Sequence, residues 1–375
     1  MGGLYIHIPY CRQACRYCDF YFTVSHQNQD QFTEALLKEL EIRAPEQDKS
    51  TSLETLYLGG GTPSLLRYGN LERIVATVKR FYSFSDNPEI TIECNPDDLD
   101  DSLTAFLREL GFNRISMGIQ SFRDEDLLLM RRSHSAEQAS QAVHGLAAAG
   151  FENITVDLIY GIPGQDLKAW SENIQKALEL PVNHISAYHL TFEPGTVFDH
   201  WRKKGRISPV PEEKSVEMYR LLKEKLAGAG YEHYEISNFA RKGWRSRHNQ
   251  LYWSGLPYLG FGPSAHSFSG PYRHWNVASL KQYIKALEEG SPLSEKEELT
   301  DKERYHDYLI TSLRTSEGAD PAKILERFGE SVLKHFSSKS RLFISSGRMI
   351  ERGNRVAIES DSWLLADHIM RELFL

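Results

Sequence analysis

The sequence predicts an α/β protein, in which a partial (β/α)6 TIM-like barrel precedes a smaller C-terminal helical, winged-helix-like module. Three observations lead to this prediction. Short runs rich in Ile, Val, Leu and Tyr occur six times, and most end at Gly, Pro or Asn, as strands do. Stretches with helical spacing of apolar residues separate the runs, which favours a parallel sheet wrapped by helices. The alternation stops near residue 230. An open doubly wound sheet is the alternative.

The predicted strands and helices alternate along the first two-thirds of the chain. The strand-like runs cover residues 4–8, 53–59, 89–94, 114–119, 154–161 and 184–192. The helical stretches lie near residues 30–43, 70–82, 101–110, 135–149, 167–179 and 213–228. In the first of these helices, Phe32, Leu36 and Leu40 recur every four residues, and this spacing places them on one face.

The sequence divides into three parts. Residues 1–235 form the predicted barrel core, and residues 236–299 form an aromatic-rich connecting segment. Residues 300–375 form the C-terminal module, whose last part reads as two short strands around a Gly-Asn turn followed by a helix. The three helices expected before that hairpin lie at 302–314, 320–328 and 330–345.

The composition is that of a globular protein. The chain has 375 residues, of which 41% are hydrophobic and 25% charged, and its net charge is -7. Because nucleic-acid-binding proteins are usually basic, no nucleic-acid partner is expected, and the mixed charge of the C-terminal hairpin favours a protein or substrate lid. The sequence shows neither a signal peptide nor an apolar run long enough to span a membrane. We therefore expect a cytoplasmic protein, with peripheral association at a membrane still open.

Three of the four cysteines form a tight group directly after the first predicted strand. Cys11, Cys15 and Cys18 have the spacing C-x3-C-x2-C, whereas Cys94 follows 76 positions after Cys18. Such a group in a cytosolic protein indicates metal binding or catalysis rather than disulfides. A structural zinc site needs four ligands, so zinc and unrelated buried thiols are the alternatives to an iron–sulfur cluster with one open iron.

The stretch "CRQACRYCDF", with Tyr17 just before the last cysteine, resembles the signature of the radical S-adenosylmethionine (SAM) enzymes. The resemblance implies that the barrel is of the radical SAM type, with residues 1–235 as its core domain. It also implies that Cys11, Cys15 and Cys18 bind a [4Fe-4S] cluster and that SAM chelates the fourth iron. In that family, one electron from the cluster cleaves the sulfonium to give a 5′-deoxyadenosyl radical.

Further motifs follow the successive strands in the order of this family. "GGGTP" follows the second strand, and its three glycines allow close backbone approach to a ligand. Two carboxylates also have structural explanations. Glu93, at the end of a strand in "ECNP", could simply be solvated, and Asp157, inside an apolar strand, could form a buried salt bridge. The SAM-binding residues that the resemblance implies are Tyr5, Tyr17, Gly60, Gly61, Thr62, Glu93, Gln120, Arg132 and Asp157.

The order of motifs along nearly the whole chain resembles one branch of the family. This branch contains the oxygen-independent coproporphyrinogen III dehydrogenases and the haem chaperones related to them. The dehydrogenases carry a further cysteine two positions after the third, where this chain has Phe20, and they have a long extension before the cluster, where only ten residues precede Cys11. Both departures favour a haem chaperone.

The segment "HNQLYW" resembles the H-N-x-x-Y-W motif of the haem chaperones, which is associated with haem binding in that group. His248, Asn249, Tyr252 and Trp253 are therefore the predicted haem-binding residues. An imidazole is a common ligand of haem iron, and Tyr and Trp offer flat apolar faces. The alternative is a hydrogen-bonded histidine with two core aromatic residues.

The resemblance therefore implies a haem chaperone that hands haem to an acceptor protein, with a membrane haemoprotein among the candidate acceptors. The implied cofactors are a [4Fe-4S] cluster, SAM and haem, and an electron donor such as a flavodoxin or a ferredoxin is expected. The alternative is oxidative decarboxylation of coproporphyrinogen III by radical chemistry. Whether the chain is an enzyme stays open at this point.

Overall fold

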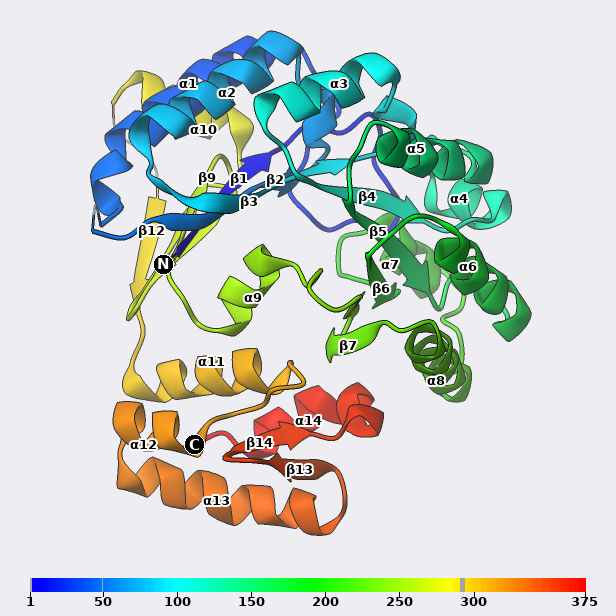
Figure 1. Ribbon diagram of the computed structural model, residues 1–375, viewed down its shortest axis with the longest axis vertical. Helices are drawn as coiled ribbons and strands as arrows, with labels where there is room; N and C mark the ends of the chain where they lie inside the picture. The colour runs from blue at the N-terminus through cyan, green and yellow to red at the C-terminus, as the bar shows by residue number, and fades with distance from the viewer. Residues whose placement is uncertain (1, 49, 291–293) are drawn as a thin grey trace.

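The computed structural model describes residues 2–48, 50–290 and 294–375 and contains one large, strongly curved sheet (Figure 1). The order of its strands is β12-β11-β10-β9-β1-β2-β3-β4-β5-β6-β8-β7. The seven central strands are parallel. They are β9 (Tyr258–Phe261), β1 (Gly2–Ile8), β2 (Leu53–Gly60), β3 (Phe84–Cys94), β4 (Arg114–Gln120), β5 (Asn153–Tyr160) and β6 (His184–His189).

Helices cover the convex side of the sheet, as Figure 1 shows for α1 to α3, α5, α6, α8 and α10. Because one face carries the helices, the arrangement is an open, partial barrel and not a doubly wound sheet. The helices of this part of the chain are α1 (Gln29–Ile42), α2 (Tyr68–Phe81), α3 (Asp101–Leu110), α4 (Asp124–Met130), α5 (Ala136–Ala148), α6 (Leu167–Glu179), α7 (Val197–Lys203), α8 (Glu212–Gly228), α9 (Arg247–Trp253) and α10 (Leu280–Glu288). The six predicted strands and the six predicted helices of this part are confirmed, whereas α4, α7, α9 and α10 were not predicted.

Local sequence signals explain where several helices begin and end. The Ser135 hydroxyl accepts a hydrogen bond from the Gln138 backbone N–H, and the Gln138 side-chain oxygen accepts one from the Ser135 backbone N–H, which completes a capping box at the start of α5. Asp166 caps α6 in a similar way by accepting from the backbone of Ala169. Gly111 ends α3 in the left-handed conformation at φ 94°, which glycine adopts without strain.

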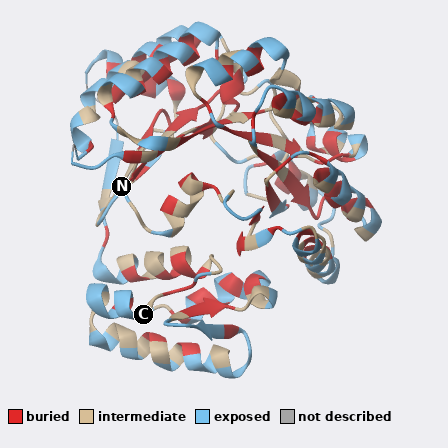
Figure 2. Ribbon diagram, in the orientation of Figure 1, coloured by how far each residue is buried: buried red, intermediate tan, exposed pale blue. Residues whose placement is uncertain are grey.

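The two faces of the parallel strands differ in chemistry because successive side chains point to opposite sides. In β1, Leu4, Ile6 and Ile8 are fully buried and belong to the hydrophobic core. Tyr5 and His7 alternate with them and point to the concave side, where Tyr5 lies near the His248 ring. Figure 2 shows the resulting band of buried strands beneath the outer helices. The concave face is therefore the more polar one.

The described residues of the segment 236–299 extend the sheet at both edges. β9 pairs in parallel with β1 and adds a seventh parallel strand, and α10 packs against α1. The antiparallel edge strands are β7 (Glu232–Glu235), β8 (Asn238–Ala240), β10 (His266–Ser269), β11 (Tyr272–Asn276) and β12 (Ser294–Glu298). Helix α9 lies on the concave side of the curved sheet (Figure 1).

The C-terminal module contains the predicted three helices, hairpin and final helix. Its elements are α11 (Asp301–Leu313), α12 (Pro321–Phe328), α13 (Glu330–Ser345), β13 (Met349–Arg352), β14 (Arg355–Ile358) and α14 (Ala366–Glu372). Helix α11 contacts α9, so the module faces the concave side of the sheet. Among the described residues, no helix combines the length and the apolar character that crossing a membrane requires.

Candidate cluster and ligand site

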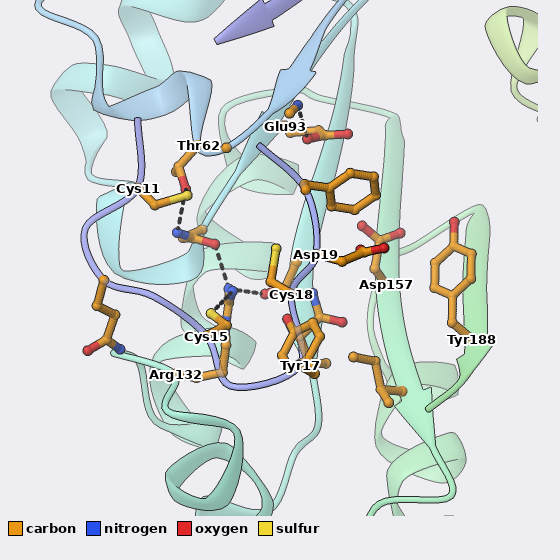
Figure 3. A pocket seen from close by; sticks show the side chains of 18 of the residues that line it. Cys11, Cys15, Tyr17, Cys18, Asp19, Thr62, Glu93, Arg132, Asp157 and Tyr188 are labelled. Carbon is orange, nitrogen blue, oxygen red and sulfur yellow. Dashed lines mark hydrogen bonds between the residues drawn. The ribbon is translucent and has the colours of Figure 1, made fainter. Parts of the chain in front are cut away.

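A cavity of about 390 Å³ opens at the carboxyl ends of the parallel strands. The loop after β1 and the ends of β2 to β6 line it, which is where barrel enzymes of this architecture place their chemistry. Figure 3 shows the three cysteines of the loop, together with Thr62 and Arg132, facing Asp157 and Tyr188 from the later strands. The tertiary structure thus gathers residues that are more than 170 positions apart in the chain.

Backbone hydrogen bonds hold the cysteine loop in place. The Cys11 backbone N–H donates to the Thr23 carbonyl at 2.9 Å, and the Arg16 N–H donates to the Met130 carbonyl at 3.1 Å. The Thr62 hydroxyl lies 3.8 Å from the Cys11 sulfur and donates to it. The loop is therefore built by contacts to distant segments and does not depend on helix or strand geometry of its own.

All three thiols of the loop line the cavity. Burial raises the pKa of Cys11 to about 11 and that of Cys18 to about 12, so both are protonated thiols at neutral pH without a metal. Iron would displace these protons, because the thiolate is the form that binds metal. Among the residues that the structure describes, no three metal-ligating side chains converge on one point as the ligands of a single ion do.

Arg132 brings a guanidinium to the cysteine loop. It donates to the Asn95 side chain at 2.5 Å and to the Gly118 carbonyl at 2.6 Å, and its Nη1 lies 3.6 Å from the Cys15 sulfur. Its Nε is fully buried and has no hydrogen-bond partner among the described residues. The cluster and SAM that the cysteine motif implies both fit this cation, because Arg132 lines the cavity and its positive charge favours a negatively charged cluster beside the thiolates and a carboxylate in the cavity.

The glycine loop approaches the cysteine loop at backbone distance. Gly60 has φ 107°, a conformation that side chains disfavour, and a Cβ there would lie 2.5 Å from the His7 ring. A Cβ at Gly61 would lie 2.6 Å from the Tyr10 carbonyl oxygen. Both glycines and Thr62 line the cavity, and the absence of side chains at the two glycines allows this turn to pack directly against β1 and the start of the cysteine loop.

Glu93 ends β3 inside the cavity wall. The Tyr57 hydroxyl donates to its Oε1 at 2.7 Å, and the Gly60 backbone N–H donates to its Oε2 at 3.1 Å. Burial raises the pKa of this carboxyl to about 7, against the opposing effect of these hydrogen bonds. Glu93 is therefore a hydrogen-bonded side chain of the cavity wall, and the alternative of a strand-end carboxylate solvated by bulk water is not favoured.

Asp157 on β5 lies on the wall opposite the cysteines (Figure 3). The Ser116 hydroxyl donates to it at 3.3 Å. Burial raises its pKa to about 6, although hydrogen bonds from Ser186 and Ser116 and the nearby arginines oppose this shift. Since serines and not a cation are its direct partners, the structural salt bridge considered from the sequence is absent at Asp157 among the described residues.

Two of the remaining predicted SAM residues line the cavity and one does not. Tyr17 and Gln120 are in the wall, and Gln120 has φ 69°, an uncommon conformation for a residue with a side chain. Tyr5 is not part of the wall. Its hydroxyl is 3.2 Å from His7 Nδ1, and its ring lies 6.4 Å from that of His248, so it belongs to an aromatic group beneath the cavity.

The predicted haem-binding residues lie on α9, apart from the cavity. His248 is 1% exposed, and both of its ring nitrogens are hydrogen-bonded, to the Thr55 hydroxyl at 2.6 Å and to the Tyr252 hydroxyl at 2.8 Å. Asn249 and Trp253 are half-buried. The Trp253 indole lies under the Arg314 guanidinium at 5.4 Å, where α9 meets the C-terminal module. In this conformation neither nitrogen of His248 is free to bind iron.

The structure adds cavity residues that the sequence reasoning missed. Asn95 follows Glu93 within the "ECNP" motif, and Ser116 alternates with apolar residues along β4, so strand periodicity could have indicated its inward direction. Tyr188 precedes the end of β6 and also lines the cavity. Tyr57 does not line the cavity but is hydrogen-bonded to Glu93, and no sequence motif marked it, because this contact depends on how β2 and β3 pack.

Comparisons with known proteins show which proteins this chain resembles. The family model of the radical SAM superfamily matches residues 5–177. The heme chaperone HemW of Bacillus subtilis is 36% identical over 373 residues, which cover 98% of this chain and 98% of that protein. The heme chaperone HemW of Synechocystis is 37% identical over 85% of this chain and 79% of that protein. The structure of coproporphyrinogen III oxidase (HemN) from Escherichia coli, a radical SAM enzyme, is similar with a TM-score of 0.86 and 25% identity over 99% of this chain and 89% of that one.

Proposed function

Because the chain belongs to the radical SAM superfamily, and within it to the family of the HemW haem chaperones, we propose that it binds haem and transfers it to an acceptor protein. The observation that carries the proposal is the 36% identity to a protein named as a haem chaperone over 98% of both chains. The acceptor is a haem-dependent protein, and membrane haemoproteins are among the candidates. An electron donor such as a flavodoxin or a ferredoxin would serve the cluster.

We propose that Cys11, Cys15 and Cys18 hold the [4Fe-4S] cluster of the family and that the cavity beside them binds SAM. Such a cluster supplies single electrons when it is bound. Arg132 holds its guanidinium beside Cys15 in the cavity wall, where its positive charge would attract the carboxylate of SAM. Glu93 and Asp157, both half-buried in the cavity wall, offer two carboxyl groups to the cationic amino and sulfonium groups of SAM.

We propose that haem binds at α9, through the H-N-x-x-Y-W residues His248, Asn249, Tyr252 and Trp253. Iron ligation by His248 requires the ring to give up one of its two hydrogen bonds, at a cost of about 0.5–1.5 kcal/mol. Tyr252 Oη, bound to Nε2, is the partner on the same helix, and its release leaves the bond to Thr55 in place. Haem uptake therefore includes a local rearrangement of α9.

Decarboxylation of coproporphyrinogen III is the second candidate, because the HemN structure superimposes with a TM-score of 0.86. Two findings favour the chaperone. The named haem chaperone is 36% identical to this chain, against 25% for HemN. In addition, Phe20 occupies the position where the resemblance places the further cysteine of the dehydrogenases. Product formation from coproporphyrinogen III, with SAM and a reductant under anaerobic conditions, would reverse this preference.

An anaerobic haem titration of cluster-reconstituted protein, followed by Soret absorption, tests the proposal. The wild type should bind haem saturably, and His248→Ala should bind more weakly or with a shifted Soret band. Tyr252→Phe frees His248 Nε2 without removing the ring, so it should bind at least as tightly as the wild type. Tyr258→Phe is the matched control, because it removes a neighbouring hydroxyl that is not bonded to His248.

No haem binding by the wild type would refute the chaperone function. Equal titrations for the wild type and His248→Ala would keep the function but exclude His248 as the ligand.

A further inference from the structure

Strand β2 connects α9 to the cavity through side chains on a single face. Thr55, Tyr57 and Gly59 alternate along the strand and therefore point to the same, concave side. Thr55 is hydrogen-bonded to His248 at the lower end of this row. Gly59 precedes the glycines of the cavity wall at the upper end. Tyr57 lies between the two, although it is not itself part of the cavity wall.

The neighbouring strand β3 anchors α9 at a defined position. Glu89 accepts hydrogen bonds from the backbone N–H groups of Arg247 at 3.1 Å and His248 at 2.9 Å, the first residues of the helix. A carboxylate at this end of a helix satisfies otherwise free donors. Glu93 lies four residues further along β3 and so faces the same side as Glu89. The helix with the histidine and the cavity are thus built on the same two strands.

Tyr57 contacts both sides of this arrangement. Its ring stacks on the His248 ring, with centroids 5.0 Å apart and an angle of 24°. Its hydroxyl donates to Glu93 Oε1 at 2.7 Å. The absence of a side chain at Gly59 makes room for this bond, because a Cβ there would lie 2.7 Å from Tyr57 Cε1 and 2.9 Å from Glu93 Oε1. The position of the Glu93 carboxylate therefore depends on the Tyr57 ring.

We propose that Tyr57 and His248 are positioning residues of the SAM site: His248 holds the Tyr57 ring, and the Tyr57 hydroxyl holds the Glu93 carboxylate in the cavity wall. The inference rests on the proposed SAM site and not on the proposed haem cargo. It assigns the buried histidine of the H-N-x-x-Y-W motif a role that its two hydrogen bonds and its burial support directly. It also implies that iron ligation by His248 disturbs the SAM site.

SAM binding to cluster-reconstituted protein, measured by anaerobic calorimetry without haem, tests the first link. Tyr57→Phe removes only the hydroxyl, so the ring stacking remains. Because hydrogen bonds to charged groups are among the stronger ones, we expect the Kd for SAM to rise about tenfold or more. Wild-type affinity in Tyr57→Phe would overturn the proposal.

The second link is tested at His248. His248→Ala removes the ring that supports Tyr57 and should weaken SAM binding about threefold to tenfold, although His248 does not line the cavity. His248→Phe keeps a flat ring and should restore most of the affinity. His233→Ala is the matched control, because His233 also stacks on an aromatic ring, that of Phe239 at 4.0 Å, but lies on the edge strand β7.

The double variant distinguishes positioning from general destabilisation. If His248 acts through Tyr57, adding His248→Ala to Tyr57→Phe should weaken SAM binding by much less than it does in the wild type. Additive effects, or equal losses in His248→Ala and His233→Ala, would refute the link. If His248→Ala does not fold, Tyr57→Phe and His248→Phe still decide the question. A wild type that binds no SAM would overturn the SAM site itself, whereas equal binding by all variants overturns this inference alone.

Discussion

Replacement of Gly61 by alanine tests whether backbone contact between the glycine loop and the cysteine loop positions Cys11. A Cβ at Gly61 would lie 2.6 Å from the Tyr10 carbonyl oxygen and 2.9 Å from that of Ile8. Both atoms belong to the backbone, so no side-chain rotation relieves the overlap. The chain just before Cys11 would have to move.

The size of the effect follows from the contacts that this movement disturbs. The Gly61 N–H donates to the Ile8 carbonyl at 2.8 Å, and the Thr62 N–H donates to the Tyr10 carbonyl at 2.6 Å. Overpacking costs about 1–3 kcal/mol, and each weakened hydrogen bond adds about 0.5–1.5 kcal/mol. We therefore expect Gly61→Ala to lower the free energy of unfolding by about 2–4 kcal/mol.

Two measurements check this expectation: thermal unfolding of the cluster-free protein and the iron content after anaerobic reconstitution. Gly61→Ala should unfold several degrees lower and hold less iron than the wild type. Gly145→Ala is the control, because nothing lies within 4 Å of a Cβ at this exposed position of α5. It should raise stability by about 0.5–1 kcal/mol and leave the iron content unchanged. A Gly61→Ala protein with wild-type stability and full iron content would refute the reasoning.

Three further predictions concern charge in the interior. Arg132→Lys loses the forked geometry that reaches Asn95 and should weaken SAM binding about tenfold or more in calorimetry, and unchanged affinity would contradict the assigned role. Burial raises the pKa of Glu93 to about 7, so the anion forms only above that pH, and SAM affinity should rise from pH 6 to 8. Glu93→Gln should flatten this rise and leave only the part due to Asp157, whose pKa is raised to about 6. An unchanged pH profile of SAM affinity would show that Glu93 does not bind SAM through its carboxylate. Burial lowers the pKa of His248 to about 3, so below about pH 6.5 only the unfolded chain takes up this proton, and stability falls as the pH falls. At pH 5 the loss is about 2 kcal/mol, and His248→Phe should show a smaller decrease in melting temperature between pH 7 and 5 than the wild type.

The sequence by itself determined the six central strands of the sheet and the grouping of three thiols in one loop. Local periodicity encodes which face of a segment is apolar, and this information was sufficient to predict the six strands from β1 to β6 and the helices that cover them. The spacing of Cys11, Cys15 and Cys18 and the three consecutive glycines at the end of β2 are local features too. All of these cysteines and two of the glycines line one cavity.

Only the tertiary structure decided where the later segments and the buried polar side chains lie. Strand β9 pairs with β1, which lies about 250 residues earlier, and no local pattern in residues 236–299 encodes that partner. His248 has the sequence context of a ligand, but Thr55 and Tyr252 occupy both of its nitrogens. The role of Tyr57 depends on a distance of 2.7 Å to a residue on another strand. Such contacts depend on how distant segments pack together, and the free energy of that packing is not a property of any single segment.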